Sequence, residues 1–264
     1  MSGASAVVAL VLVQWTGGWI AAAAWSQSWG EIKRGHFRIT AWITAVLGVL
    51  AFLADRAAVG GLGERAALQR GTVLALVVVA IAYLAVQYSR TDVPAVVVGA
   101  VGGVVGVAAL VFSSGLLKGW PVLLATVHLI GGMVLLGAVM NGMMLGHWYL
   151  NQPGLKPAAL ARLTKLALGA AAFSFAMGAL TAAKLAGAPT EDAVLGLPGF
   201  GASFGLVFFV SWLVLLAFTA AVLWAAWRCV KIRSIQSATG LFYVAVLSAG
   251  VAEFIVRYLM VNAV

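Results

Sequence analysis

Residues 93–114 read VPAVVVGAVGGVVGVAALVFSS. The run contains no charged residue, and at 1.5 Å per residue it is long enough to cross a hydrocarbon layer about 30 Å thick. Two overlapping GxxxG spacings, Gly99 with Gly103 and Gly102 with Gly106, leave one face of this helix without side chains. Because a neighbouring backbone can then approach closely, we expect this glycine stripe to be a helix-packing face.

Comparable apolar runs follow one another along the chain, which is 64% hydrophobic and 9% charged, with a mean hydropathy of +1.08. Hydropathy and helix-breaking residues predict eight spans, at roughly 4–26, 38–58, 72–90, 94–114, 120–149, 163–186, 203–228 and 238–262. The loops between them are short. We therefore expect an all-α fold, a polytopic integral membrane helical bundle in which residues 1–264 form a single transmembrane domain.

The first span has no basic residues before its apolar run, so we expect it to be retained as a helix rather than cleaved as a signal peptide. Cys229 is the only cysteine, which excludes an internal disulfide and any CxxC motif. The formal net charge is +9. Because the basic residues fall in short loops between spans, we interpret them as determinants of membrane topology and expect a lipid bilayer, not nucleic acid, as the partner.

The charges are divided unequally between the two sides. Eight spans place both termini on one side, and the first, third, fifth and seventh loops on the other. Those loops and their flanks contain only two acidic residues, Glu31 and Asp92, against ten basic ones: Lys33, Arg34, Arg38, Arg90, Lys156, Arg162, Lys165, Arg228, Lys231 and Arg233. The positive-inside rule then predicts cytoplasmic loops and non-cytoplasmic termini, in a multi-pass protein of a prokaryotic-type inner (cytoplasmic) membrane.

Two polar stretches lie on the predicted cytoplasmic side. Residues 146–157 read GHWYLNQPGLKP, and RSIQSATG begins the last span. We interpret the first as an interfacial helix exit whose turn is made by Pro153 and Gly154. If the fifth and last helices meet, the two stretches form one polar cytoplasmic interface, made by His147, Tyr149, Asn151, Arg233 and Gln236.

A b-type haem is an alternative for the histidines. His36 and His147 lie on the same predicted side and can bracket a haem only if their helices are neighbours. His128 is nineteen residues before His147, about 28 Å along one helix, so one metal cannot bind both. We expect interfacial hydrogen bonding instead, and no metal site.

Glu253, in the last span, is the residue whose insertion into the membrane costs the most free energy. Arg257 follows one helical turn later. An unpaired carboxylate at this depth costs about 2.5–3.5 kcal/mol on insertion scales. We expect Glu253 to face the bundle interior or a water-filled cavity rather than lipid, paired with Arg257 and with a polar group of another helix, while the long arginine reaches the outer interface. A proton-exchange site and a purely structural ion pair both fit this pattern. His128, Tyr83, Asp55 and Lys184 are further candidates to line a ligand-binding cavity on the outer side.

The eight spans with both ends outside, the segment HLIGGMVLLGAVMNGMMLG at 128–146 and the ending AGVAEFIVRYL at 249–259 resemble the membrane anchor subunit of dimethyl sulfoxide and polysulfide reductases. The last helix of that family often carries Gly-Glu-x-x-x-Arg. Here Ala252 precedes Glu253, and the two cytoplasmic stretches have no counterpart in the family pattern. The resemblance implies a subunit that holds a soluble iron-sulfur and molybdenum partner and exchanges electrons and protons with a quinone, without a haem, through Glu253 and Arg257.

We therefore expect an integral membrane subunit of a respiratory electron-transfer complex that anchors redox partner subunits and binds quinone, with no covalently bound cofactor. As an enzyme it is at most a non-catalytic or quinone-reactive subunit of an oxidoreductase. The alternatives are a small-solute transporter, a purely structural assembly subunit and a b-type cytochrome. Transport predicts inverted repeats, which the sequence does not display. GxGxxG, P-loop and HExxH motifs are absent, which argues against nucleotide-binding and zinc-protease chemistries.

Overall fold

The computed structural model describes residues 3–186 and 204–262, and this part of the chain contains helices and no strands. Eight helices are long and apolar enough to cross a membrane, so the all-α polytopic prediction is confirmed. The eight helices are α1 (Gly3–Gln27), α2 (Arg34–Val59), α3 (Ala67–Val86), α4 (Val93–Ser114), α5 (Val122–Trp148), α6 (Ala158–Leu180), α8 (Phe204–Lys231) and α9 (Ile235–Asn262). The 3₁₀ segment η1 (Gly60–Ala66) joins α2 to α3, and the short helix α7 (Ala182–Ala186) follows α6.

Several helix boundaries differ from the predicted spans, and α2, α6 and α9 begin three to five residues earlier than predicted. The span predicted at 163–186 is two helices, because Thr181 leaves the helical region (φ −108°, ψ 8°) between α6 and α7. The third helix is shifted toward the N-terminus, to Ala67–Val86. Helix α8 continues three residues past the predicted end at 228, to Lys231, a basic residue that favours the negative end of the helix dipole. Residue 203, where the seventh span was predicted to start, lies outside the described residues.

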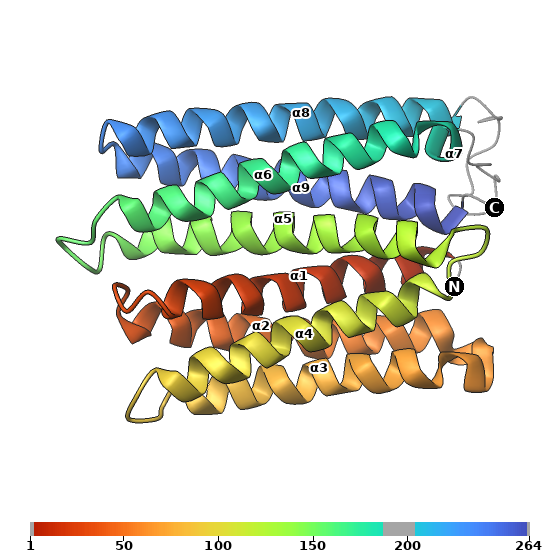
Figure 1. The fold of residues 1–264 in the computed structure, drawn as a ribbon, viewed down its shortest axis with the longest axis horizontal. Coiled ribbons are helices and arrows are strands. Elements are labelled where there is room, and N and C mark those ends of the chain that lie inside the picture. The colour runs from red at the N-terminus through yellow and green to blue at the C-terminus, as the bar shows by residue number, and fades with distance from the viewer. Residues whose placement is uncertain (1–2, 187–203, 263–264) are drawn as a thin grey trace.

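The contacts between helices divide them into two four-membered rings, which lie one above the other in Figure 1. In the first, α1 contacts α2 and α4, and α3 contacts both of these. In the second, α5 contacts α6 and α9, and α8 contacts both of these. The first helix of each ring, α1 or α5, starts at the same end of the molecule, the end where the chain begins. The helices of the two rings therefore follow the same order and run in the same directions. They are therefore parallel units, not inverted ones.

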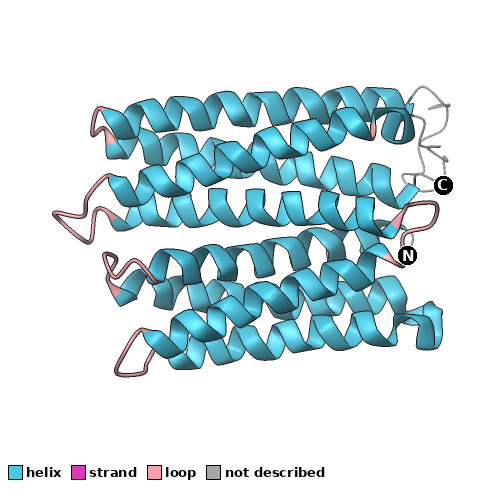
Figure 2. Cartoon of the chain, viewed as in Figure 1, coloured by secondary structure: helices cyan, strands magenta, loops and turns pink. Residues whose placement is uncertain are grey.

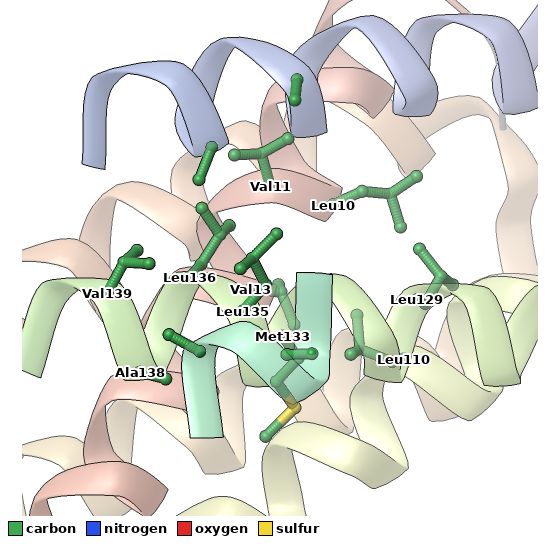
Figure 3. Close-up of a cluster of buried hydrophobic side chains, with 14 of the residues drawn as sticks. Leu10, Val11, Val13, Leu110, Leu129, Met133, Leu135, Leu136, Ala138 and Val139 are labelled. Carbon is green, nitrogen blue, oxygen red and sulfur yellow. The ribbon is translucent and has the colours of Figure 1, made fainter. Parts of the chain in front are cut away.

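Helix α1 joins the two rings, since it contacts α5 and α9 as well as its own neighbours. Of the eight spans α1 is the most buried, since 78% of its apolar 18-residue stretch lies inside the protein. Figure 3 shows part of this junction, where Leu10, Val11 and Val13 of α1 lie among apolar side chains of α5 and α4. The core of the molecule is thus centred on α1 and α5.

Glycines allow the helices around α1 to approach closely. A Cβ on Gly106 of α4 would meet the backbone of Gly17, and one on Gly99, Gly102 or Gly103 would meet side chains of α1 at 2.7–2.9 Å. The GxxxG stripe is therefore a packing face against α1, as predicted. On the other side of α1, a Cβ on Gly137 of α5 would overlap the backbone of Gly18.

The loops gather at two ends (Figures 1 and 2). We call the end with residues 28–33, 87–92, 149–157 and 232–234 the basic end, because the ten basic residues named above lie in or beside these segments. The start of α1 and the end of α9 lie at the other end, which we call the terminal end (Figure 1). The predicted separation of charge along the bundle therefore agrees with the fold.

Candidate functional site

A fully enclosed ion pair lies in the terminal half of α9. Glu253 and Arg257 are 1% and 0% exposed, and Arg257 Nη2 donates to Glu253 Oε2 at 2.5 Å, with Nε at 3.2 Å. The guanidinium also donates to the His128 carbonyl through Nη2 at 3.2 Å, and its Nη1 contacts Met260 Sδ at 2.6 Å. The arginine therefore stays inside the protein, and the prediction that it reaches the outer interface is wrong. Inward acceptors hold each of its nitrogens.

A second helix supplies a polar partner, as predicted for Glu253. Gln14 of α1 donates through Nε2 to Glu253 Oε2 at 3.3 Å and to the Leu129 carbonyl at 2.7 Å. Gly132 of α5 makes room for this contact, because a Cβ there would overlap both Glu253 Oε2 and Gln14 Nε2. The carboxylate thus lies where α1, α5 and α9 meet, between the two rings.

His128 completes this group of side chains, which we call the junction cluster: Gln14, His128, Glu253 and Arg257. Its Nδ1 lies 3.4 Å from Arg257 Nη1, a hydrogen bond if Nδ1 carries no proton. Its ring packs between Trp120 and Trp212, at centroid distances of 6.3 and 5.8 Å. His128 Nε2 and Gln14 Oε1 are buried and have no hydrogen-bond partner among the described residues. The cluster thus holds a carboxylate together with unused polar atoms.

The other predicted ligand-binding residues lie apart from Glu253. Asp55 of α2 is buried in the first ring, where it accepts a hydrogen bond from Gln69, which also lies 3.5 Å from Ser113 Oγ. Tyr83 of α3 donates to Gln27 Oε1 at 3.3 Å, near the basic end. Lys184 lies over the Trp120 ring, 5.4 Å from its centroid, so that Trp120 separates it from His128. Of the four candidates, the structure brings only His128 to Glu253.

An apolar cavity of about 370 Å³ lies beside the junction cluster at the terminal end. Its walls come from α1, α8 and α9, and include Val7, Phe254, Ile255 and Tyr258. The α9 wall residues neighbour Glu253 and Arg257 in the chain but lie on another face of the helix. None of the four residues of the junction cluster lines the cavity, so the carboxylate is not open to it in this structure.

The two polar stretches of the basic end share a cavity, which three of the five predicted interface residues line, whereas Asn151 and Arg233 do not. His147 and Tyr149 of one, and Gln236 of the other, line a common cavity of about 510 Å³. Gly154 has a positive φ of 86°, which fits the turn predicted at Pro153 and Gly154. Asn151 is exposed, and Arg233 lies in the turn before α9 with a φ of 61°.

The Tyr149 hydroxyl makes two hydrogen bonds with backbone groups of the following loop and helix. It donates to the Lys156 carbonyl at 2.7 Å and accepts from the Leu160 N–H at 3.4 Å. Burial raises the pKa of Tyr149 to about 12, the Leu160 hydrogen bond opposes this, and the Glu31 carboxylate adds to it. The phenol is therefore neutral in the physiological pH range.

His36 does not share a site with His147. It is buried beside Trp148, and its Nε2 lies 3.2 Å from Asn141 Oδ1. Asn141 in turn donates to the Ala22 carbonyl and Ser26 Oγ of α1, at 3.2 and 3.0 Å. His147 lies in the cavity wall instead. The structure therefore gives these two histidines different surroundings.

Sequence reasoning missed Gln14 and Gly132. Gln14 is the one amide side chain in an otherwise apolar stretch of the first span, a signal as clear as that of Glu253. Gly132 belongs to a Gly-Gly pair whose partner across the helix interface cannot be read from one sequence. Gln152 was also missed as a link between loops: it accepts from the Lys33 N–H at 2.9 Å and donates to the Glu31 carbonyl at 2.8 Å.

The fold and the junction cluster together define a class, a polytopic α-helical membrane protein with a buried ion pair between two four-helix rings. Comparison of the chain with protein-family models, with curated proteins and with solved structures gave no match.

Proposed function

We propose that this chain is an integral membrane subunit of an electron-transfer complex, in which Glu253 exchanges protons with a quinone. The observation that supports the proposal is the junction cluster itself. Charged groups inside membrane helices are costly and commonly mark proton or substrate paths. A complex that only needed helix packing could fill this position with apolar side chains at no electrostatic cost.

The cavity beside the cluster supports the quinone part of the proposal. Its walls are almost wholly apolar, and its volume of about 370 Å³ is in the range of small-molecule sites. A quinone ring there contacts α9 at Phe254 and Ile255, the residues that follow Glu253 in the chain. Tyr258 provides a hydroxyl in the same wall.

The chemistry assigned to the site is proton transfer. Oxidation of a quinol releases two electrons and two protons. The Glu253 carboxylate accepts one proton and the other passes to water at the terminal end, while the electrons pass to the redox centres of partner subunits. Arg257 and Gln14 hold the carboxylate in place through their hydrogen bonds to Oε2.

Glu253→Gln tests this role, because the amide keeps the shape and accepts a hydrogen bond but cannot take up the proton. In membranes that hold the complete complex, we expect quinol-linked turnover to fall about 10²-fold or more with normal assembly. Asp55→Asn is the matched control, since Asp55 is an equally buried carboxyl in the other ring. Unchanged turnover of an assembled Glu253→Gln complex would leave the ion pair as a structural element only.

Small-solute transport is a second candidate, because parallel structural repeats also occur in transporters. Against it, α1 and α5 meet at the ring junction through glycine backbones, and apolar side chains fill the space around them. Uptake of labelled solutes by proteoliposomes containing the chain alone distinguishes the two: transport predicts flux without partner subunits.

A further inference from the structure

The cavity between α5 and α9 at the basic end is separate from the junction cluster. We call it the α5/α9 pocket. It has a volume of about 510 Å³ and is lined by residues that include Gly146, His147 and Leu150 on one side and Gln236, Gly240 and Tyr243 on the other. Gly240 lies thirteen residues before Glu253, about 20 Å along α9, so the pocket and the carboxylate lie toward opposite membrane faces.

Glycines give the pocket its shape. At its inner edge the helices touch, because a Cβ on Gly146 would overlap the Thr239 hydroxyl. At Gly240 they diverge: a Cβ there would meet no atom within 4 Å. The space beside Gly240 is therefore open, and Leu150, Gln236 and Tyr243 around it are exposed on the bundle surface. In a membrane such a groove faces lipid.

The lining of the α5/α9 pocket is polar at its outer part and apolar farther into the membrane. His147 and Gln236 lie at its outer part, and neither side chain has a hydrogen-bond partner among the described residues. Tyr243 lies two helical turns farther into the membrane, about 10 Å from Gln236 along α9. A polar part at head-group depth followed by an apolar part is the arrangement that a single lipid molecule requires.

The charge around the pocket favours an anionic head group. The basic end carries ten basic residues against Glu31 and Asp92, and these two carboxylates already pair with Arg162 and Arg34, at 3.2 and 2.6 Å. The pocket lining contains no acidic residue. Arg233 comes two residues before the lining residue Ile235, and the free N–H groups of the first turn of α9 add positive potential.

We propose that the α5/α9 pocket binds one anionic phospholipid from the leaflet at the basic end. Its head group lies against His147, Gln236 and the start of α9, and one acyl chain lies over Gly240 and Tyr243. The lipid fills the groove between the first and last helices of the second ring. This inference does not depend on the proposed redox function, and it is tested without turnover.

The test is native mass spectrometry of the full chain, purified in detergent and supplied with phosphatidylglycerol or phosphatidylcholine of identical acyl chains. Wild type retains one phosphatidylglycerol in preference to phosphatidylcholine. Gly240→Leu fills the open space and lowers phosphatidylglycerol retention about fivefold or more. Gly169→Leu is the matched control, because Gly169 is an exposed helical glycine of α6 with no atom near its Cβ position, and it retains lipid like wild type.

Two further variants separate the parts of the site. Arg233→Asn removes the charge while tolerating the positive φ, so it lowers retention of phosphatidylglycerol but not of phosphatidylcholine. Gln236→Leu removes a polar contact with the head group at an exposed position, so it lowers phosphatidylglycerol retention without filling the pocket. Wild-type retention in Gly240→Leu, equal retention of the two lipids by wild type, or a pocket ligand that proves to be a quinone would each overturn the proposal.

Discussion

Arg257 lies only five residues before the end of α9, yet it is completely enclosed. Lone arginines near helix ends usually extend toward the head groups. Here the guanidinium contacts Glu253 Oε2, the His128 carbonyl and Met260 Sδ inside the protein. These contacts replace the hydration that the arginine would gain by extending to the head groups. The pair is therefore costly to break from one side: removing only the carboxylate leaves a buried charge, with a typical cost of about 3–5 kcal/mol.

This cost predicts different outcomes for two substitutions of the same residue. Glu253→Leu leaves Arg257 without its carboxylate, so we expect little folded protein in the membrane. Glu253→Gln keeps an acceptor for the guanidinium, so we expect a clearly higher yield. Fluorescence-detected size-exclusion chromatography of tagged variants measures this. Equal yields would show that the pair contributes nothing to folding.

Gly132 is the residue that gives the carboxylate its space. Gly132→Ala places a methyl group against Glu253 Oε2 and Gln14 Nε2, and we expect destabilisation of about 1–3 kcal/mol, seen as a lower thermal midpoint in detergent. Gly169→Ala, with no atom near its Cβ position, should match wild type or exceed it slightly. Equal midpoints for the two variants would contradict the close packing described for the cluster.

Tyr149 yields a prediction about pH. Because its pKa is raised to about 12, the folded state keeps a proton that the unfolded state loses near pH 10. The stability that this neutral phenol contributes is complete below pH 10 and is lost as the pH rises through 12. The difference in phenolate absorbance between wild type and Tyr149→Phe should therefore titrate near pH 12. A midpoint near 10 would show that the hydroxyl is not enclosed.

At this scale the sequence predicted the types of residue better than their partners. The depth of Glu253 and its spacing from Arg257 predicted the pair, because both follow from helix geometry. The contact with Gln14 joins residues 239 positions apart, and no local pattern specifies it. For the same reason Asp55, Tyr83 and Lys184 were grouped with Glu253 as candidates, although packing distributes them over separate helices.

Helix α1 is the element on which the packing depends. Its glycines meet α4 on one side and α5 on the other, with Gly17 against Gly106 and Gly18 against Gly137. Without a strong hydrophobic driving force between helices in lipid, such close backbone approach is a main source of association. The GxxxG spacing revealed the α4 side of this packing. The α5 side has a less regular glycine pattern and was not predicted.

Gly137→Ala tests this element directly. The added methyl group meets backbone atoms of Gly18, which cannot rotate away as a side chain can, so α1 and α5 must separate. We expect a thermal midpoint well below that of wild type, by roughly the 1–3 kcal/mol typical of overpacking. Gly71→Ala on α3, where no atom lies near the Cβ position, is the control. A midpoint equal to that of Gly71→Ala would place the two helices farther apart than described.

The whole molecule presents a basic end and a terminal end, and the positive-inside rule assigns the basic end to the cytoplasm. A reporter fused after Val264 should then be active outside the cytoplasm, and one inserted between Lys156 and Arg162 active inside. Arg228 and Lys231 lie over Trp224 and Trp227, at 5.6 and 3.6 Å, as interfacial side chains do. The reverse reporter pattern would contradict the assignment of sides.

Hydropathy predicted the eight spans because membrane thickness fixes their length, whatever their neighbours are. The two parallel rings could not be predicted, since ring order depends on which helix faces meet. Boundaries were displaced where apolar residues continue past a helix end, as at Thr181, or where a helix continues into basic residues, as at Lys231.

The central claim, that Glu253 exchanges a proton during quinone chemistry, is tested most directly by infrared difference spectroscopy of the intact complex. Spectra of the oxidised and quinol-reduced complex report changes in the carbonyl stretching of protonated carboxyl groups. Our account predicts such a band in wild type and in Asp55→Asn, and its loss in Glu253→Gln. A band that persists in Glu253→Gln, or that disappears in Asp55→Asn instead, would contradict it.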